Sequence, residues 1–219
     1  MQPQTGTSSG WKSVSTSSRF VFALALSLAA AAPASAGEVR GRVALGVQGV
    51  SFEDAGPVVV YLEGDGGAPL HYELPKRALE IHQKDASFKP SFLVIAAGET
   101  VVMPNDDVIF HNVFSYSTPN DFDLGLYPRG ESRTKTFQYP GVVRMYCSIH
   151  ESMSATIFVA PSIWHAVAGS HGEFEIRDVP PGKYRLRTWN RRLPPVSQAI
   201  EVKADVVTAN LVVASSAAP

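Results

Sequence analysis

The sequence contains a single cysteine, Cys147, among its 219 residues. A disulfide framework needs an even number of cysteines, so that class of small stapled scaffold is excluded. Charged residues make up only 18% of the chain and the formal net charge is −1, so neither a disordered chain nor a nucleic-acid-binding protein is indicated. The chain also lacks a sustained helical hydrophobic period and an apolar run of the roughly 20 residues that span a membrane.

The N-terminal segment has the order of a secretory signal peptide. A polar stretch with Lys12 and Arg19 precedes an apolar run at 20–32, and Ala34-Ser35-Ala36 supplies the small residues of a cleavage site. We therefore predict a signal peptide over residues 1–36, cleaved after Ala36, and a periplasmic or otherwise exported protein. The alternative, a membrane anchor, needs a longer run, so no stable membrane insertion is expected.

The absence of a cysteine directly after the apolar run argues against a lipid anchor. Residues 1–36 hold two of the 19 basic residues and none of the 20 acidic ones, which leaves 17 against 20 in the remainder. A net charge near −3 gives no reason to expect nucleic acid as a partner.

Short alternating or β-branched runs, separated by glycine and proline turns, predict an all-β fold. Strands are expected at 37–45, 57–63, 79–83, 92–96, 100–103, 111–116, 133–139, 142–147, 154–160, 173–177, 183–189, 198–202 and 206–213. Many short strands at this spacing favour an antiparallel sandwich or barrel.

The C-terminal strands carry a recognisable segment. Residues 172–187, Gly-Glu-Phe-Glu-Ile-Arg-Asp-Val-Pro-Pro-Gly-Lys-Tyr-Arg-Leu-Arg, resemble the carboxypeptidase-regulatory or prealbumin-like domain, a seven-stranded sandwich. That domain normally opens with strands like those at 37–45 and 57–63. We therefore predict a discontinuous sandwich of residues 37–72 plus 163–214, with 73–162 inserted after its second strand. The alternative is an N-terminal hairpin that joins the central sheet.

The central segment contains the residues that suggest chemistry. Cys147, His150 and Met153 stand at three-residue intervals just after a predicted strand. A tight loop would turn all three to one side, where a thiolate, an imidazole and a thioether suit copper better than zinc. A lone cysteine is usually a small core residue; its spacing to His150 and Met153 favours a ligand here. His111, at the start of an earlier strand, is the candidate for the second histidine.

Together the Asn105-x-Asp107 turn, His111-Asn112-Val113 and the Cys147-x-x-His150-x-x-Met153 loop resemble a cupredoxin, with loop spacing closest to that of amicyanins. The resemblance covers residues 79–160 and implies a Greek-key β-sandwich, here over 73–162, with one type-1 copper ion. It implies copper ligation in the plane by His111, Cys147 and His150 and weak axial ligation by Met153. Asn112 would join the two ligand loops, and Ile149 stands where many family members have proline.

We expect a carrier of single electrons between a donor and an acceptor protein, which acts as a monomer and not as an enzyme. One alternative is a copper-binding carrier that delivers Cu(I) to another protein, since the same soft donors favour Cu(I). A Cys-His hydrolase, with Cys147 as nucleophile and His111 or His150 as base, is disfavoured because no helix or oxyanion hole is predicted and Met153 would have no role.

Several neighbouring residues carry weaker expectations. His82 lies on a predicted strand and would change the class of copper site if it added a ligand. Asp106, Asp107 and Glu151 flank the ligands and are expected to be solvated or to cap turns. Five apolar residues form either a docking patch around His150 or part of the core: Phe114, Phe122, Leu124, Leu126 and Tyr127.

Overall fold

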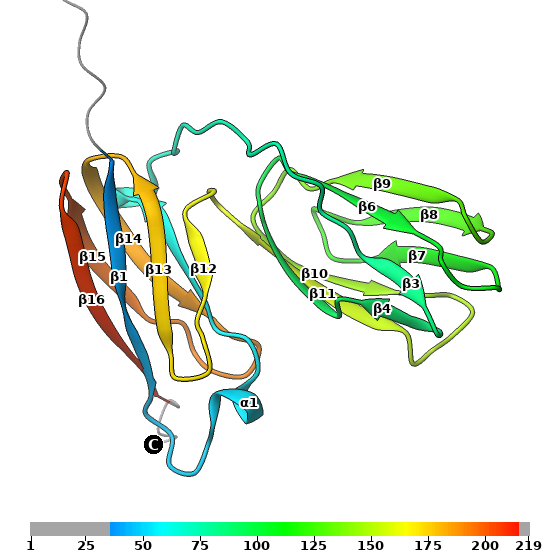
Figure 1. Cartoon of the computed structure of the whole chain (residues 1–219), viewed down its shortest axis with the longest axis horizontal. Coiled ribbons are helices and arrows are strands. Elements are labelled where there is room, and N and C mark those ends of the chain that lie inside the picture. Colours follow the sequence, from blue (N-terminus) through cyan, green and yellow to red (C-terminus); the bar gives the residue numbers. More distant parts are fainter. Residues whose placement is uncertain (1–35, 215–219) are drawn as a thin grey trace, which may run out of the picture. The chain divides into compact units, whose positions relative to one another are not determined.

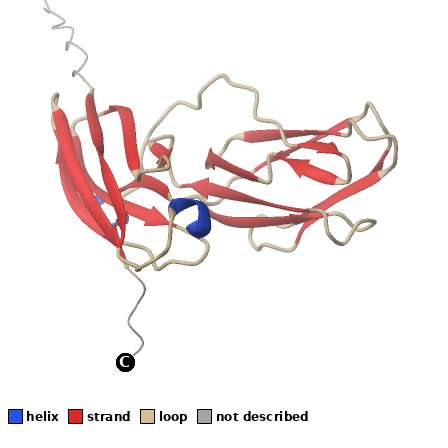
Figure 2. Ribbon diagram, turned by 60° about the horizontal axis from the view of Figure 1, so that its bottom comes forward, coloured by secondary structure: helices blue, strands red, loops and turns tan. Residues whose placement is uncertain are grey.

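Strands provide nearly all the regular structure in residues 36–214, the part of the chain that the computed structural model describes (Figure 2). The exceptions are a short helix, α1 (Phe52–Ala55), capped by Ser51, and a single 3₁₀ turn, η1 (Asp65–Gly67). The expected all-β class is confirmed. The predicted signal peptide falls outside the described residues except for Ala36, and within the described range no helix is both long and apolar enough to cross a bilayer.

The largest sheet has five strands in the order β5-β11-β10-β7-β8. Its strands are β5 (Phe92–Ala96), β7 (His111–Ser115), β8 (Phe122–Tyr127), β10 (Gly141–Tyr146) and β11 (Ser154–Ala160). β5 pairs in parallel with β11, whereas the other pairs are antiparallel. Neighbours so far apart in sequence require connections that leave the sheet and return, as in a Greek-key sandwich.

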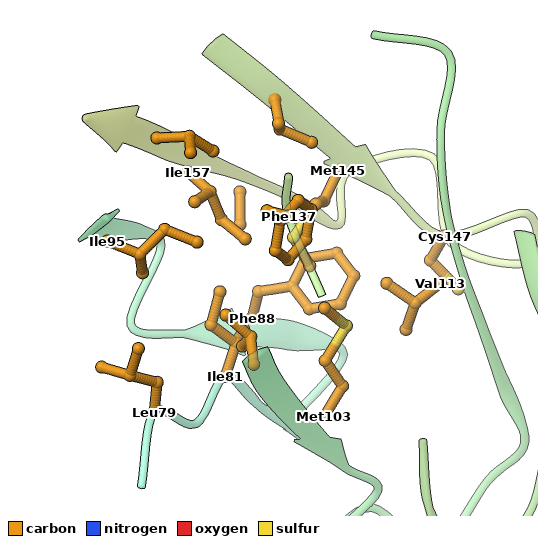
Figure 3. Packing of buried hydrophobic residues seen from close by; sticks show 14 of the residues in the cluster. Leu79, Ile81, Phe88, Ile95, Met103, Val113, Phe137, Met145, Cys147 and Ile157 are labelled. Atoms are coloured by element: carbon orange, nitrogen blue, oxygen red, sulfur yellow. The ribbon is translucent and has the colours of Figure 1, made fainter. Parts of the chain in front are cut away.

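Two pairs of antiparallel strands contribute to the same core as this sheet. They are β3 (His82–Lys84) with β4 (Ser87–Lys89), and β6 (Thr100–Pro104) with β9 (Ser132–Thr136). The shared cluster of buried residues runs from Leu79 to Val159 and includes Phe137, Met145, Cys147 and Met153. Figure 3 shows Cys147 beside Val113 in this cluster. The only thiol is therefore packed among core side chains and kept from bulk water.

The remaining strands form a three-stranded sheet, β13-β1-β16, and a four-stranded sheet, β12-β2-β14-β15. Figure 1 shows β1 between β13 and β16. The strands are β1 (Gly37–Leu45), β2 (Val59–Gly64), β12 (His165–Val167), β13 (Glu173–Val179), β14 (Gly182–Trp189), β15 (Ser197–Val202) and β16 (Val206–Val213).

Both of these sheets contribute to one buried cluster, which contains residues from Val39 to Leu62 and from Trp164 to Val213. On β14, Tyr184, Leu186 and Thr188 are buried at alternating positions, the pattern of a strand with one face on a core. The chain therefore returns to this core after the central strands. The assignment of these strands to a discontinuous prealbumin-like domain stays a prediction.

Strand prediction was wrong mainly at short or irregular strands. β4, β8 and β12 were not expected, and β3 begins at His82, three residues later than predicted. β8 escaped notice because Asp123 and Gly125 interrupt its apolar pattern. Gly125 has φ +68, and the pairing of β7 with β8 shifts in register between Asn112 and Phe114. Such irregularities reverse the alternation that identifies a strand in sequence.

Candidate metal centre

The candidate ligands come from two segments of the five-stranded sheet. β7 begins at His111, and β10 ends at Tyr146, which pairs with Phe114 of β7. Cys147 is thus the first residue of the loop 147–153 between β10 and β11. Because β7 and β10 run antiparallel, the start of one lies beside the end of the other. The sheet itself brings His111 to the loop.

Two backbone hydrogen bonds close this loop. The Cys147 nitrogen donates to the Met153 oxygen over 3.3 Å, and the Met153 nitrogen donates to the His150 oxygen over 3.0 Å. The chain therefore folds back between Cys147 and Met153 instead of continuing along the strand. This fold of the loop holds His150 next to Cys147.

The side chains of His111, Cys147 and His150 converge on one point. Cys147 Sγ lies 3.6 Å from His111 Nδ1 and 4.0 Å from His150 Nδ1. The two imidazole rings have centroids 5.0 Å apart and planes inclined at 59°. Within the described residues, this is the one group of three or more histidine, cysteine or acidic side chains whose ligand atoms all lie within 4.8 Å of one another.

These separations fit a single metal ion. An ion bound about 2.1 Å from nitrogen and about 2.3 Å from sulfur holds such atoms about 3.6 to 3.8 Å apart, at angles between tetrahedral and trigonal. The observed nitrogen–sulfur separations lie at or just above that range. The donor set is a thiolate sulfur and two imidazole nitrogens, a set that suits copper. The residues present therefore fit a copper ion.

The three groups differ in their access to water. His111 is fully buried, Cys147 is 5% exposed, and His150 is partly exposed. Met153 is buried in the same core cluster as Cys147, with 1% exposure. The structure thus places the predicted axial residue in the core near the cysteine. The histidine on the loop is the member of the group that reaches the surface.

Sequence reasoning missed the role of Asp107. Its Oδ2 lies 3.1 Å from His111 Nε2, and the carboxylate side chain is only 13% exposed. The hydrogen bond from the Ala86 nitrogen, followed by that from His111, lowers the pKa of Asp107 below its ordinary value. The prediction of a solvated or merely capping carboxylate was therefore incomplete. Spacing in a loop gives no sign that a side chain will turn back onto a histidine four residues later.

Asn105 braces the loop that carries Asp107. It is fully buried, and its Nδ2 donates to the carbonyl oxygens of Ile109 and Tyr127 over 2.9 and 3.0 Å. Its Oδ1 accepts a hydrogen bond of 2.9 Å from the Asp107 nitrogen. The Asn105 side chain thus provides hydrogen bonds for three backbone groups and holds in place the loop that precedes His111.

Asn112 makes a different contact from the one expected. Its Nδ2 donates to Asp123 Oδ1 over 2.9 Å, which joins β7 to β8. Its Oδ1 is buried and has no hydrogen-bond partner within residues 36–214. The expected link between the two ligand segments through Asn112 stays a prediction.

Comparisons with known proteins give partial matches to solved structures. No family model matches the chain, and the curated proteins contain no match. Solved structures that match part of the chain include a purple cupredoxin from Nitrosopumilus maritimus, which is 24% identical, with 37% of this chain and 99% of that chain covered and a TM-score of 0.35. A reduced amicyanin variant is 19% identical, with 40% and 86% coverage and a TM-score of 0.36.

A copper-containing nitrite reductase from Thermus scotoductus is also similar. It is 27% identical over 42% of this chain, with a TM-score of 0.37, and the match spans a quarter of the reductase. The structural neighbours thus include cupredoxins, and each of these three matches covers about two-fifths of this chain.

His82, the candidate for an additional ligand, lies outside the cluster of three. Its Nδ1 contacts Asp106 Oδ2 at 2.5 Å and its Nε2 contacts Glu80 Oε2 at 2.9 Å. The hydrogen bond to Asp106, assisted by Glu80, raises the pKa of His82. Both ring nitrogens therefore face carboxylates, and no lone pair is directed at a metal.

The structure decides between core and surface for four of the five apolar residues that the sequence left open. Tyr127 is fully buried, and Phe122 and Leu124 pack against the core, whereas Leu126 is 59% exposed. The reason is the irregular β8, where the register shift and Gly125 turn Tyr127 inward and Leu126 outward. Sequence reasoning missed four other exposed apolar residues beside the ligands, namely Val108, Ile109, Phe110 and Ile149.

Proposed function

We propose that this protein is an exported, periplasmic type-1 copper protein of the cupredoxin kind, which carries single electrons between partner proteins and has no catalytic turnover. The observation that carries the proposal is the convergence of His111 Nδ1, Cys147 Sγ and His150 Nδ1 at separations suited to one metal ion. Their chemistry and the buried thioether nearby favour copper. Copper bound there would supply one-electron oxidation and reduction.

The protein's own part is to hold the donors still. His111 is held by a sheet strand, and Cys147 follows directly on another. The loop that carries His150 is closed by hydrogen bonds at both ends of its turn. A donor set fixed in this way changes little between the two oxidation states of a bound metal, so little rearrangement opposes electron transfer.

His150 is the ligand through which electrons would pass to or from a partner protein. It is the partly exposed member of the group, and Ile149 beside it is 48% exposed. Phe110, which directly precedes His111, is 54% exposed. A small apolar surface around one ligand suits the weak, short-lived complexes of redox proteins. The donor and acceptor are proteins that would use this surface, and the carrier is proposed to act as a monomer.

The test is spectroscopic. Purified protein loaded with Cu(II) should absorb strongly at about 600 nm through charge transfer from the Cys147 thiolate, and its electron paramagnetic resonance spectrum should be that of a type-1 site. The Cys147→Ser variant should lose this band. His82→Gln, which removes a histidine outside the group, is the matched control and should keep it. A colourless wild-type protein, or a Cys147→Ser variant with the same spectrum, contradicts the proposal.

Repeated reduction and reoxidation tests the carrier role. The blue band should disappear and return through many cycles with no copper released to a Cu(I) chelator. Release of the metal on reduction would instead indicate delivery of Cu(I).

A further inference from the structure

A chain of hydrogen bonds leads from the turn between β3 and β4 to the buried His111. The Ala86 nitrogen, in that turn, donates to Asp107 Oδ2 over 2.8 Å. The same oxygen lies 3.1 Å from His111 Nε2, and His111 Nδ1 lies 3.6 Å from Cys147 Sγ. Three segments that are separate in sequence are thus linked through the Asp107 carboxylate and the His111 ring. The imidazole of His111 stands between this carboxylate and the thiol.

The chemistry of the carboxylate decides which nitrogen of His111 carries a proton. An ionised aspartate offers only acceptors, so the proton between Asp107 and His111 belongs to Nε2. A neutral imidazole protonated at Nε2 has its lone pair on Nδ1. Nδ1 is the atom that faces Cys147. The contact with Asp107 therefore leaves the donor electron pair of His111 directed at the metal position.

Asp107 is itself held in several ways. Its Oδ1 accepts a hydrogen bond of 3.0 Å from the Val108 nitrogen, and its own nitrogen donates to Asn105 Oδ1. The turn that supplies the Ala86 nitrogen has Asp85 at φ +54 and Ala86 at φ +47. A residue with a Cβ is disfavoured there, and unfavourable backbone of this kind is often retained at functional sites.

We propose that Asp107 is the positioning residue of His111: it fixes the Nε2–H tautomer and the ring orientation, so that Nδ1 is presented to the metal before the metal binds. Metal-bound histidines commonly donate their second nitrogen to such a partner. The identity of the metal rests on the proposed function, but the tautomer is a property of the metal-free protein. His150 has no corresponding carboxylate contact within the described residues.

The neighbouring residue provides a matched control. Asp106 carries the same charge one position earlier, but its Oδ2 contacts His82 and not His111. Asp107→Asn removes the carboxylate that faces the ligand, whereas Asp106→Asn removes one from the same turn. A difference between the two variants isolates the contact from the charge of the loop.

The first measurement uses metal-free protein at pH 8. Correlation spectra of the ring nitrogens by ¹⁵N nuclear magnetic resonance report which nitrogen of His111 is protonated. We expect the proton on Nε2 in the wild type and in Asp106→Asn, and a mixture of tautomers in Asp107→Asn. A wild type with the proton mainly on Nδ1 overturns the proposal, and so does Asp107→Asn with an unchanged tautomer. The wild-type result decides even if Asp107→Asn does not fold.

The second measurement is Cu(II) affinity by competition with a chelator. Loss of a partner of this kind typically weakens metal binding by about 10- to 100-fold, and we expect that loss for Asp107→Asn. Asp106→Asn should stay within about twofold of the wild type, because an exposed ion pair has little effect. An equal loss in both variants overturns the proposal. A wild type that binds no copper refutes the proposed function, whereas the tautomer still tests this inference.

Discussion

Cys147 Sγ lies 3.6 Å from His111 Nδ1, although the two residues stand 36 positions apart in the chain. The contact depends on the antiparallel pairing of β7 with β10, which sets the beginning of one strand beside the end of the other. Half of the candidate metal centre is therefore a consequence of sheet register. The other half, His150 and Met153, follows from the fold of one short loop.

Met153 allows the axial position to be tested separately from folding. Met153→Leu preserves volume and should cost less than about 1.5 kcal/mol of unfolding free energy. Met153→Ala leaves a cavity at a residue only 1% exposed and should cost about 2 to 5 kcal/mol. With copper bound, Met153→Leu should keep the blue colour and have a more positive reduction potential, because Cu(II) loses a donor. Protein voltammetry and urea unfolding measure the two effects; an unchanged potential contradicts the axial assignment.

His82 should make stability depend on pH. The hydrogen bond to Asp106 raises the pKa of His82 above its ordinary value of 6.5, so the folded protein holds this proton more tightly than the unfolded chain. The stabilisation is complete below the unfolded-state pKa and is lost as the pH rises through the folded-state pKa. His82→Gln should therefore destabilise the protein at pH 5.5 and much less at pH 9. The effect is small because His82 is 39% exposed, and equal destabilisation at both pH values contradicts this account.

Substitution of Tyr127 tests the hydrogen bonds that its buried hydroxyl makes with Met103 and Gln83. Its hydroxyl donates to the Met103 oxygen over 2.9 Å and accepts from Gln83 Nε2 in a fully buried site. Tyr127→Phe leaves buried polar groups with fewer partners and should cost about 1 to 3 kcal/mol in urea unfolding. Tyr116→Phe, at a residue 83% exposed, is the control and should have almost no effect.

Tyr127 should also affect stability in alkali. Burial raises the pKa of Tyr127 to about 12 from its ordinary value of 10.0, so the folded protein retains the phenolic proton that the unfolded chain releases. Stability should fall as the pH rises from 10 towards 12, and Tyr127→Phe should fall less steeply. An identical alkaline dependence in both proteins would show that folding does not raise the pKa of Tyr127.

The apolar surface beside the ligands should control the rate of electron exchange. Phe110→Ser, at a residue 54% exposed, should lower the self-exchange rate of copper-loaded protein by about tenfold, equivalent to about 1.4 kcal/mol of docking energy. The potential should not change, since the ligand atoms are untouched. Val212→Ser, at a residue 60% exposed on β16, should leave the rate unaltered. Line broadening in mixtures of oxidised and reduced protein measures both rates, and equal rates exclude docking through Phe110.

The sequence was informative where a local pattern corresponds to a local structure. Alternation or β-branched runs predicted the bounds of four strands correctly, namely β1, β5, β11 and β16. The same pattern failed on β8, because Gly125 and the shifted register reverse the faces of Leu126 and Tyr127. Whether Leu126 and Tyr127 belong to the core or to the surface therefore depended on strand pairing, which the sequence does not show.

The sequence by itself determined the all-β class and the chemical identity of the candidate ligands. Residue type, the spacing of Cys147, His150 and Met153, and the single thiol are properties of the chain. Tertiary structure decided the convergence of His111 with the loop and the role of Asp107. The physical reason is that hydrogen bonds such as that from Ala86 to Asp107 join segments whose proximity depends on how whole strands pair and turn.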